Sequence, residues 1–357
     1  ENFNSLIWTG DGTSSRAITG LGFQPDFSWF KERSDTQSHT LFDSVRGATK
    51  YLNSNSNGIE GTLSDGLTSF DSDGWTMGDD LANNGDTETY VAWNWKAGGA
   101  PTADNSAGAG ATPTAGSVKI DGSNLGSALA GTLAATRLSA NTTAGFSIVK
   151  YVGTGATATI AHGLGVTPEL VIVKSMDSAE AWNVYAKPVS AAPETDYLTL
   201  NGTAAVADDD RFWNDTAPSA SVFTVGSYDG TNKSTDDLIA YCFVSVAGYS
   251  KVGIYTGNAD VNGTFVYTGF SPAFIIRKPV GSGGWSMTDN KRIPYNVHDK
   301  PLYANNSNAE PGGAGDLIDQ VSNGFKVRTS DAGTNPSGAD MLYLAFAESP
   351  FKYSNAR

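Results

Sequence analysis

The sequence predicts an all-β protein made of three tandem β-sandwich-like repeats of about 100 residues, with one Gly/Ala/Thr-rich linker. Three observations support this fold class: motifs that recur at fixed spacing, short β-branched or aromatic runs, and a turn-rich composition. Glycine supplies 41 of the 357 residues, and charged residues make up 17%. Average domains have about 7% glycine and about 25% charged residues, so turns are abundant here and charges are few.

The recurring motif begins with an aromatic-x-Gly triplet. It occurs as Trp8-Thr9-Gly10, Tyr151-Val152-Gly153 and Tyr255-Thr256-Gly257. In each copy a proline follows the aromatic residue after 17 positions (Pro25, Pro168, Pro272), and a lysine follows the proline after six (Lys31, Lys174, Lys278). Each copy ends in an apolar run, at residues 90–93, 238–241 and 342–346. Fixed spacing of this kind is typical of repeated structural units, so we divide the chain into β repeats 1–97, 146–250 and 251–357.

Within a repeat, the sequence pattern predicts short strands for most segments. Runs such as Val171-Ile172-Val173 and Phe274-Ile275-Ile276 have strand length, and Asx-Gly dipeptides such as Asp73-Gly74 supply the turns between them. We expect each recurring proline to lie in a turn before a first or edge strand, and each recurring lysine to end a strand in solvent. We expect the tryptophans at equivalent or alternating positions to be core. Three sandwiches in a row are the first expectation; a closed, pseudo-threefold arrangement is the alternative, and the sequence does not separate them.

Residues 98–145 form the predicted linker. The segment is rich in Ala, Gly, Thr and Ser, and residues 98–116 lack the large apolar side chains that offset the entropy of ordering. That part is therefore expected to be flexible or extended. Leu129, Leu133 and Leu138 lie near helical spacing, which favours a short helix over residues 127–138, although Gly131 weakens it.

Charge and cysteine content exclude several classes of protein. The net charge is −14 with 23 Lys and Arg residues, so no nucleic-acid partner is expected. Cys242 is the only cysteine, which excludes an intrachain disulfide. No apolar run reaches 18 residues and no charged-then-apolar leader is visible, so neither membrane insertion nor a signal peptide is expected.

Candidate chemistry is sparse. The densest acids, Asp71 with Asp73, Asp79 with Asp80, and Asp208-Asp209-Asp210, lie among turn residues and select no acid/base pair. Calcium at Asp71-Ser72-Asp73 or Asp208-Asp209-Asp210 is the one cofactor alternative, without the pattern of an EF-hand loop. His39 and His298 are expected in polar loops and His162 in a turn, at positions that do not correspond between repeats. We therefore expect no catalytic residue, no metal site and no cofactor, and the ligand-binding residues stay unknown.

Several segments of this sequence are similar to a known group of proteins. They include Phe23-Gln24-Pro25-Asp26-Phe27, Leu41-Phe42-Asp43-Ser44-Val45-Arg46-Gly47, Phe70-Asp71-Ser72-Asp73-Gly74-Trp75, Phe265-Val266-Tyr267-Thr268-Gly269-Phe270 and Ala345-Phe346-Ala347-Glu348-Ser349-Pro350-Phe351. With these segments the chain resembles a family of three-repeat, tail-fibre-like virion proteins from marine tailed phages. The resemblance covers nearly the whole chain outside the linker and carries no catalytic residues with it.

The resemblance implies a non-enzymatic structural protein of the virion, a tail fibre or surface appendage that binds a host-surface receptor or glycan. Its expected partners are other virion proteins, and a homo-oligomer, by analogy a trimer. Receptor contacts are expected in the loops at residues 37–57, 208–221 and 289–315. Two alternatives stay open: a capsid-bound decoration protein, and a depolymerase that cleaves surface polysaccharide.

Overall fold

The computed structural model describes residues 2–313 and 316–348, and within them the fold is all-β, as the sequence predicts. Strands pair antiparallel except where β10 runs parallel to β12. The helices α1 (Leu81–Asn84), α2 (Asp210–Trp213) and α3 (Asp229–Asn232) are single turns, and η1 (Lys187–Val189) is a short 3₁₀ turn. Residues 314–315 of the third predicted loop and 349–357 of the third predicted repeat lie outside the described residues.

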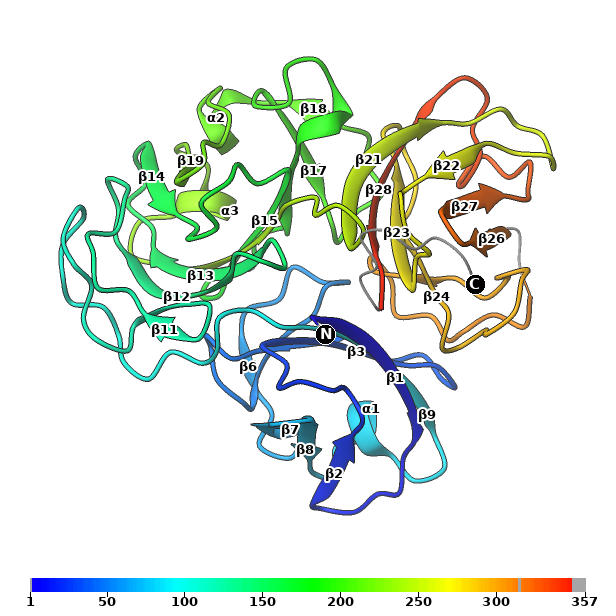
Figure 1. The fold of residues 1–357 in the computed structure, drawn as a ribbon, viewed down its shortest axis with the longest axis horizontal. Coiled ribbons are helices and arrows are strands. Elements are labelled where there is room, and N and C mark those ends of the chain that lie inside the picture. Colours follow the sequence, from blue (N-terminus) through cyan, green and yellow to red (C-terminus); the bar gives the residue numbers. More distant parts are fainter. Residues whose placement is uncertain (1, 314–315, 349–357) are drawn as a thin grey trace.

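One strand order occurs in three parts of the chain, which we name units 1, 2 and 3 (Figure 1). The large sheet of unit 1 has the order β1 (Phe3–Thr9), β9 (Thr89–Trp95), β3 (Phe27–Glu32), β4 (Thr40–Asp43), β5 (Lys50–Leu52) and β6 (Gly61–Thr62). In unit 2 the same order is β13 (Phe146–Val152), β20 (Asp237–Phe243), β15 (Leu170–Ser175), β16 (Asn183–Ala186), β17 (Asp196–Thr199) and β18 (Ala207–Asp208). In unit 3 it is β21 (Ser250–Thr256), β28 (Asp340–Phe346), β23 (Phe274–Pro279), β24 (Ser286–Asp289) and β25 (Leu302–Tyr303).

A small sheet covers the outer face of each large sheet. These sheets are β2 (Arg16–Thr19), β8 (Gly74–Met77) and β7 (Leu67–Asp71) in unit 1, β14 (Ala158–Ala161) and β19 (Val222–Val225) in unit 2, and β22 (Phe265–Tyr267), β27 (Gly324–Val327) and β26 (Ile318–Val321) in unit 3. In unit 1, Phe30 and Trp75 pack between the two layers with their ring centroids 4.9 Å apart. Each unit therefore has its own outer core.

The inner faces of the three large sheets share one central core. Alternate residues of a strand point to opposite faces, so Phe27 and Trp29 of β3 face inward while Phe30 faces outward. Their equivalents in units 2 and 3, such as Leu170 and Phe274, belong to the same central cluster. Figure 1 accordingly shows the three units around a common centre. The row of sandwiches is wrong and the closed alternative is right, because each sheet has apolar side chains on both faces and needs its neighbours to cover the inner one.

Close backbone contact explains the glycine of the aromatic-x-Gly motif. A Cβ on Gly10, Gly153 or Gly257 would lie 1.9, 2.2 or 2.1 Å from a backbone carbonyl oxygen. A buried asparagine holds the same loop in each unit; for example, the Asn84 side chain accepts from Asp11 N and donates to the Gly78 carbonyl. The motif is therefore a packing requirement of the fold.

The recurring lysines differ from the expectation of solvated strand ends. Lys31, Lys174 and Lys278 are all buried. Each ammonium donates to the carbonyl of the last residue of its strand and to one carbonyl in the loop that follows, as Lys278 does to Pro279 at 2.6 Å and Gly281 at 2.8 Å. Burial lowers the pKa of each lysine to about 8. The long side chain can be buried because these two carbonyls accept its hydrogen bonds.

The recurring prolines lie two residues before β3, β15 and β23. These strands are interior, since each is paired on both sides, so the expected edge position is wrong. The missing N–H is tolerated because pairing begins only after the proline: in unit 1 it is Asp26 N that first bonds to the Trp95 carbonyl.

The predicted linker, residues 98–145, is an ordered insertion. Its strands β10 (Val118–Ile120), β11 (Ser123–Asn124) and β12 (Ala135–Asn141) extend the large sheet of unit 2 to nine strands. No helix forms over residues 127–138. Leu129 and Leu138 are buried in the core of unit 2, but from extended backbone. The open edges of β13 and β14 supply hydrogen-bond partners here, and Gly131 has a left-handed φ of 104°, which a helix does not use.

The three units contact each other in the same cyclic way. The ring residue before β4, β16 or β24 donates its ring N–H to a carbonyl of the preceding unit in the cycle: His39 Nε2 to Tyr303 at 3.0 Å, Trp182 to Asn53 at 2.9 Å and Trp285 to Thr199 at 2.9 Å. His39 Nδ1 accepts from Trp29 Nε1, which places the proton on Nε2. His39 is thus the counterpart of two tryptophans, and its expected place in a polar loop is wrong.

A second contact is polar at two interfaces and apolar at the third. At the first interface Asp43 pairs with Arg46 at 2.5 Å and accepts from the Tyr241 hydroxyl of unit 2. At the second, Asp289 pairs with Arg292 at 2.6 Å and accepts from Trp93 Nε1 of unit 1. The third interface joins units 2 and 3. There the strand registers place Ala186 at the position of Asp43, Val189 at that of Arg46 and Leu344 at that of Tyr241. The fold accepts either chemistry, provided that each buried charge has its partner.

The first prediction concerns acid stability. Burial lowers the pKa of His39 to about 3, so the folded protein holds it neutral down to that pH, whereas the unfolded chain takes up a proton below about 6.5. Stability is therefore lost as the pH falls from about 6.5 toward 3. Between pH 7 and pH 5 the wild type should lose about 2 kcal/mol more unfolding free energy than His39→Gln, measured by urea denaturation. Equal losses would contradict this role of His39.

The second prediction concerns the first interface. Asp43→Ala removes the closer acid partner of buried Arg46, leaves Glu60 at 3.6 Å, and should cost roughly 3 kcal/mol, the low end for a broken buried pair. The triple variant Asp43→Ala, Arg46→Val, Tyr241→Leu copies the apolar third interface and should recover at least half of that loss. Denaturant titration of the variants checks this, and a triple variant less stable than Asp43→Ala would refute the equivalence of the interfaces.

Candidate functional site

The acidic clusters of the sequence have structural roles. Asp73 accepts from the Gly20 and Gly22 amides, and Asp71 accepts from Ser69 and Thr76. Asp80 caps α1, and Asp209 caps α2 while pairing with Arg211. Within residues 2–313 and 316–348, no three His, Cys, Asp or Glu side chains are grouped to hold a metal ion. The structure therefore adds no support to the calcium alternative.

The three histidines do not converge. His39 lies at the interface between units 1 and 3, and His162 accepts from Leu164 N in the predicted turn. His298 is buried beside β26 and is bridged to Ile318, so its expected place in a polar loop is wrong. Burial lowers the pKa of His162 to about 4 and also lowers that of His298.

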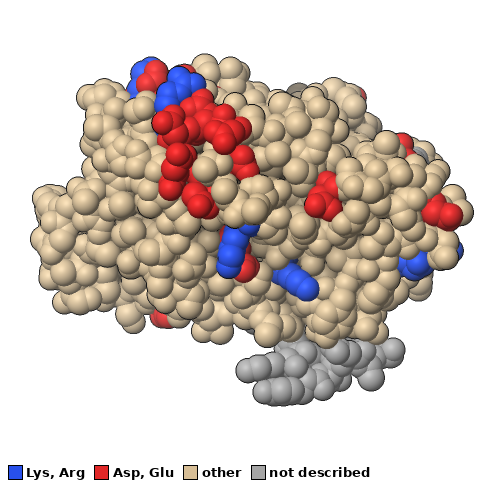
Figure 2. Space-filling view, turned by 90° about the horizontal axis from the view of Figure 1, so that it is seen from above, with Lys and Arg blue, Asp and Glu red and all other residues tan. Residues whose placement is uncertain are grey.

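The three predicted receptor loops differ in how much of each is exposed to solvent. Residues 37–57 contain β4 and β5, and much of the segment is buried in the interfaces between units, so it is no free loop. Residues 208–221 contain α2 and an exposed stretch after it. The described part of residues 289–315 carries Tyr295, which is 82% exposed. Figure 2 shows one face of the molecule, with acidic side chains gathered on part of it.

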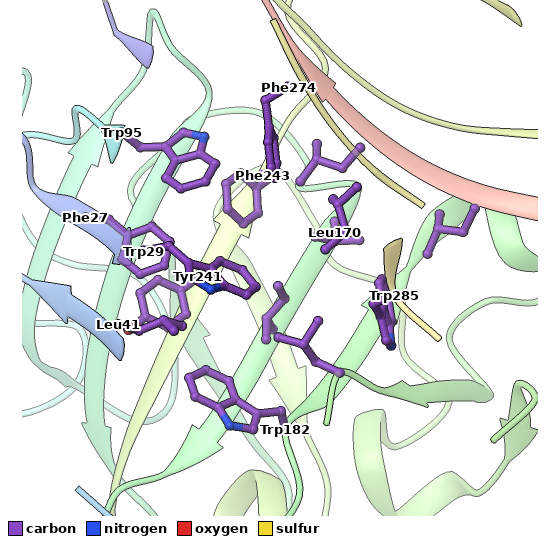
Figure 3. A pocket seen from close by; sticks show the side chains of 15 residues that line it. Phe27, Trp29, Leu41, Trp95, Leu170, Trp182, Tyr241, Phe243, Phe274 and Trp285 are labelled. Atoms are coloured by element: carbon purple, nitrogen blue, oxygen red, sulfur yellow. The ribbon is translucent and has the colours of Figure 1, made fainter. Parts of the chain in front are cut away.

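An apolar cavity of about 30 Å³ lies between the units (Figure 3). Side chains of all three units line it, among them Trp29, Trp182 and Trp285. It has room for about one water molecule and offers that water no polar partner. All eight tryptophans are buried, as expected for the core, so none can stack on an external ligand.

A polar cleft of about 560 Å³ lies between unit 1 and the insertion. Its carboxylates already serve the fold: Asp26 accepts from Ser44 and from the Ala97 and Gly99 amides, and Asp121 accepts from Thr142. Burial raises the pKa of Asp26. The cleft thus joins unit 1 to the insertion, and its acids are held by internal hydrogen bonds.

The strongest candidate is the outer face of the small sheet in unit 3. On β22, Phe265 is 46% and Tyr267 is 55% exposed, while Val266 between them points into the core. Two residues apart on a strand, the aromatic side chains share one face. Gly324 lies opposite Tyr267 on β27, so no side chain crosses from that position to cover its ring.

Two lysines flank these rings. Lys251 Nζ lies 5.7 Å from the Tyr267 ring centroid and donates to the Tyr267 carbonyl at 2.8 Å. Lys326 is directly opposite Phe265 and donates to the Gly263 carbonyl at 2.8 Å. We call the surface formed by Lys251, Phe265, Tyr267 and Lys326 the aromatic–lysine face. Exposed aromatic rings beside fixed donors can stack on the apolar side of a sugar and bind its hydroxyls.

Units 1 and 2 are internal controls for this face. Matching strand registers place Asn4, Ala17, Thr19 and Thr76 at the corresponding positions of unit 1, and Ser147, Thr159, Ala161 and Thr224 at those of unit 2. The same fold therefore forms without the aromatic rings or the lysines. Side chains that stay about half exposed gain much less burial energy than core rings do, and the other two units fold without them, so fold stability alone does not account for their size.

Sequence reasoning did not select this face. Phe265 and Tyr267 stand within a motif used only for the family resemblance, and the eight tryptophans drew attention to the core. The signal becomes visible when the three small sheets are aligned on their buried pairs, Ile18 with Trp75, Ile160 with Phe223 and Val266 with Phe325.

One protein family matches most of the chain. Residues 1–120 and 118–350 match the model of a family described as Domain of unknown function (DUF7483). The chain belongs to this family. No curated protein matches it. None of the helices in the described part of this DUF7483 protein has the length and apolar character to span a membrane.

The third prediction separates ligand binding from packing. Phe265→Ala and Tyr267→Thr copy unit 1 and should each change the unfolding free energy by less than about 1 kcal/mol. The buried neighbour gives the control, since Val266→Ala should cost about 2 kcal/mol. Thermal and urea unfolding check both values. Losses at Phe265 and Tyr267 as large as that at Val266 would assign the rings to packing.

Proposed function

We propose that the protein is a non-enzymatic structural protein of a phage virion, a tail fibre or other surface appendage, and that it binds a glycan of the host surface. The aromatic–lysine face is the binding site in this proposal. The supporting observation is the exposure of Phe265 and Tyr267 at positions where the two other units have small side chains. The resemblance to tail-fibre-like virion proteins supplies the context.

The architecture suits this role physically. The shared core holds the three units in fixed positions, and a site on a sheet is held more rigidly than a site on a loop. A ring that is already in place loses little conformational entropy when it stacks on a ligand.

The proposal extends to the assembly. Other virion proteins are the expected partners, and a homotrimer is expected by analogy with phage fibres. Three linked copies of one weak sugar site would bind a polymeric glycan with higher avidity than a single copy.

The fourth prediction tests the ligand. On an array of bacterial surface polysaccharides, the wild-type chain should bind at least one polymer without shortening it. Phe265→Ala with Tyr267→Thr should weaken this binding roughly tenfold or more, because each stacked ring contributes about 0.5–1.5 kcal/mol. Tyr295→Ala, at an exposed tyrosine outside the face, is the matched control. Absent binding, or equal losses in both variants, would reject the face as the site, and shortening of the polymer would indicate a depolymerase.

The fifth prediction tests the location. A gold-labelled antibody against this chain should mark the tail or its fibres on purified particles in electron micrographs. Label over the head would instead support a capsid decoration protein. Intact and denatured particles that both stay unlabelled would contradict a virion protein.

A further inference from the structure

The charge of the aromatic–lysine face is opposite to that of the protein as a whole. The chain carries 37 acidic and 23 basic residues, for a net charge of −14. Lys251, Lys326 and Arg328 nevertheless lie together on or beside this face. The one acid on the strands of the small sheet, Asp319, lies opposite Lys326 on β26 and pairs with Arg328 at 3.4 Å. These four side chains sum to a charge of +2.

The two lysines are also free of acid partners among the ion pairs of residues 2–313 and 316–348. A backbone carbonyl fixes each ammonium beside the rings, at Tyr267 and at Gly263, and a carbonyl carries no net charge that would cancel that of the ammonium. Both ammonium groups retain further N–H donors, since each carries three. The site therefore presents two fixed ammonium groups next to two exposed rings. Asp319, opposite Lys326, also pairs with Arg328, so this group of side chains keeps a net positive charge.

The internal controls show that these cations are specific to unit 3. The positions of Lys251 and Lys326 hold Asn4 and Thr76 in unit 1, and Ser147 and Thr224 in unit 2. Asn4 also donates to a backbone carbonyl, but to a different one: its Nδ2 bonds to Leu21 at 3.3 Å, whereas the counterpart of Tyr267 is Thr19. The fold thus forms with a neutral side chain at this position in units 1 and 2, so it does not need a positive charge there.

We infer that the aromatic–lysine face selects an acidic glycan, one that carries carboxylate or sulfate groups on its sugar rings. This inference rests on the proposed glycan-binding function. Phe265 and Tyr267 stack on the apolar ring faces, while Lys251 and Lys326 bind the anionic groups beside them. The rest of the acidic protein repels such a polymer, so charge complementarity directs it to this face.

A defined series of polymers tests the inference. Dextran, carboxymethyl dextran and dextran sulfate share one neutral backbone and differ in charge, and each can be coupled to a biosensor surface. The wild type should bind the two charged polymers at least tenfold more tightly than dextran, and added salt should weaken that binding. Lys251→Asn with Lys326→Thr should weaken it about tenfold, since two ion pairs are lost. Tyr267→Thr should also weaken it, which simple ion exchange would not predict.

Two lysines of unit 2 and the insertion, replaced in Lys119→Thr with Lys187→Asn, give the matched control and should leave binding unchanged. Equal binding of charged and neutral polymers, or no effect of the Lys251 and Lys326 changes, would overturn the inference while glycan binding on the polysaccharide array stands. Failure of the proposed function differs from this, because the array itself would then show no binding that depends on Phe265 and Tyr267.

Discussion

Burial of three inner sheet faces against one another is the interaction on which the rest of this structure depends. All six residues of β3 are buried, so apolar side chains leave both faces of the sheet. The small sheet of the unit covers one face, and only the other two units cover the second. Because hydrophobic burial scales with the apolar area removed from water, a unit taken alone would expose its whole inner face. The closed arrangement thus follows from the two-sided pattern of the strands.

Closing three units around one core brings polar groups into the interfaces, and the chain satisfies them by a cyclic rule. A ring N–H of each unit bonds to a carbonyl of the preceding unit in the cycle, through one histidine and two tryptophans. The buried Asp–Arg turn, by contrast, is present at two interfaces and replaced by apolar side chains at the third. Unpaired buried charge is costly, whereas a complete pair and a complete apolar set both pack acceptably. The hydrogen bond from a ring N–H to a carbonyl is therefore the polar contact that all three interfaces share.

The sequence predicted the β class and the buried tryptophans because turn residues and aromatic spacing are local signals. It did not decide the closed arrangement, since an apolar strand face does not reveal which partner covers it. Leu129, Leu133 and Leu138 suggested a helix because their spacing fits one, while the open edges of β13 and β14 made strand pairing the better solution. The buried lysines and the aromatic–lysine face were missed for a related reason. Their roles depend on the folded backbone: the loop after β23 turns the Gly281 carbonyl toward Lys278, and the strand register places Lys326 opposite Phe265.

The shared core also determines how the candidate site can be used, because it holds the face on unit 3 rigidly while leaving its surface residues free to differ from those of units 1 and 2. Native-state hydrogen exchange on Leu200→Ala tests the shared core most directly. Leu200 lies in the inner core of unit 2, and its truncation should cost 2–5 kcal/mol. If the three units unfold as one, the slowest amides of β9, β20 and β28 should all lose protection by the same free energy. Loss of protection in β20 alone, with β9 and β28 unchanged, would contradict the account.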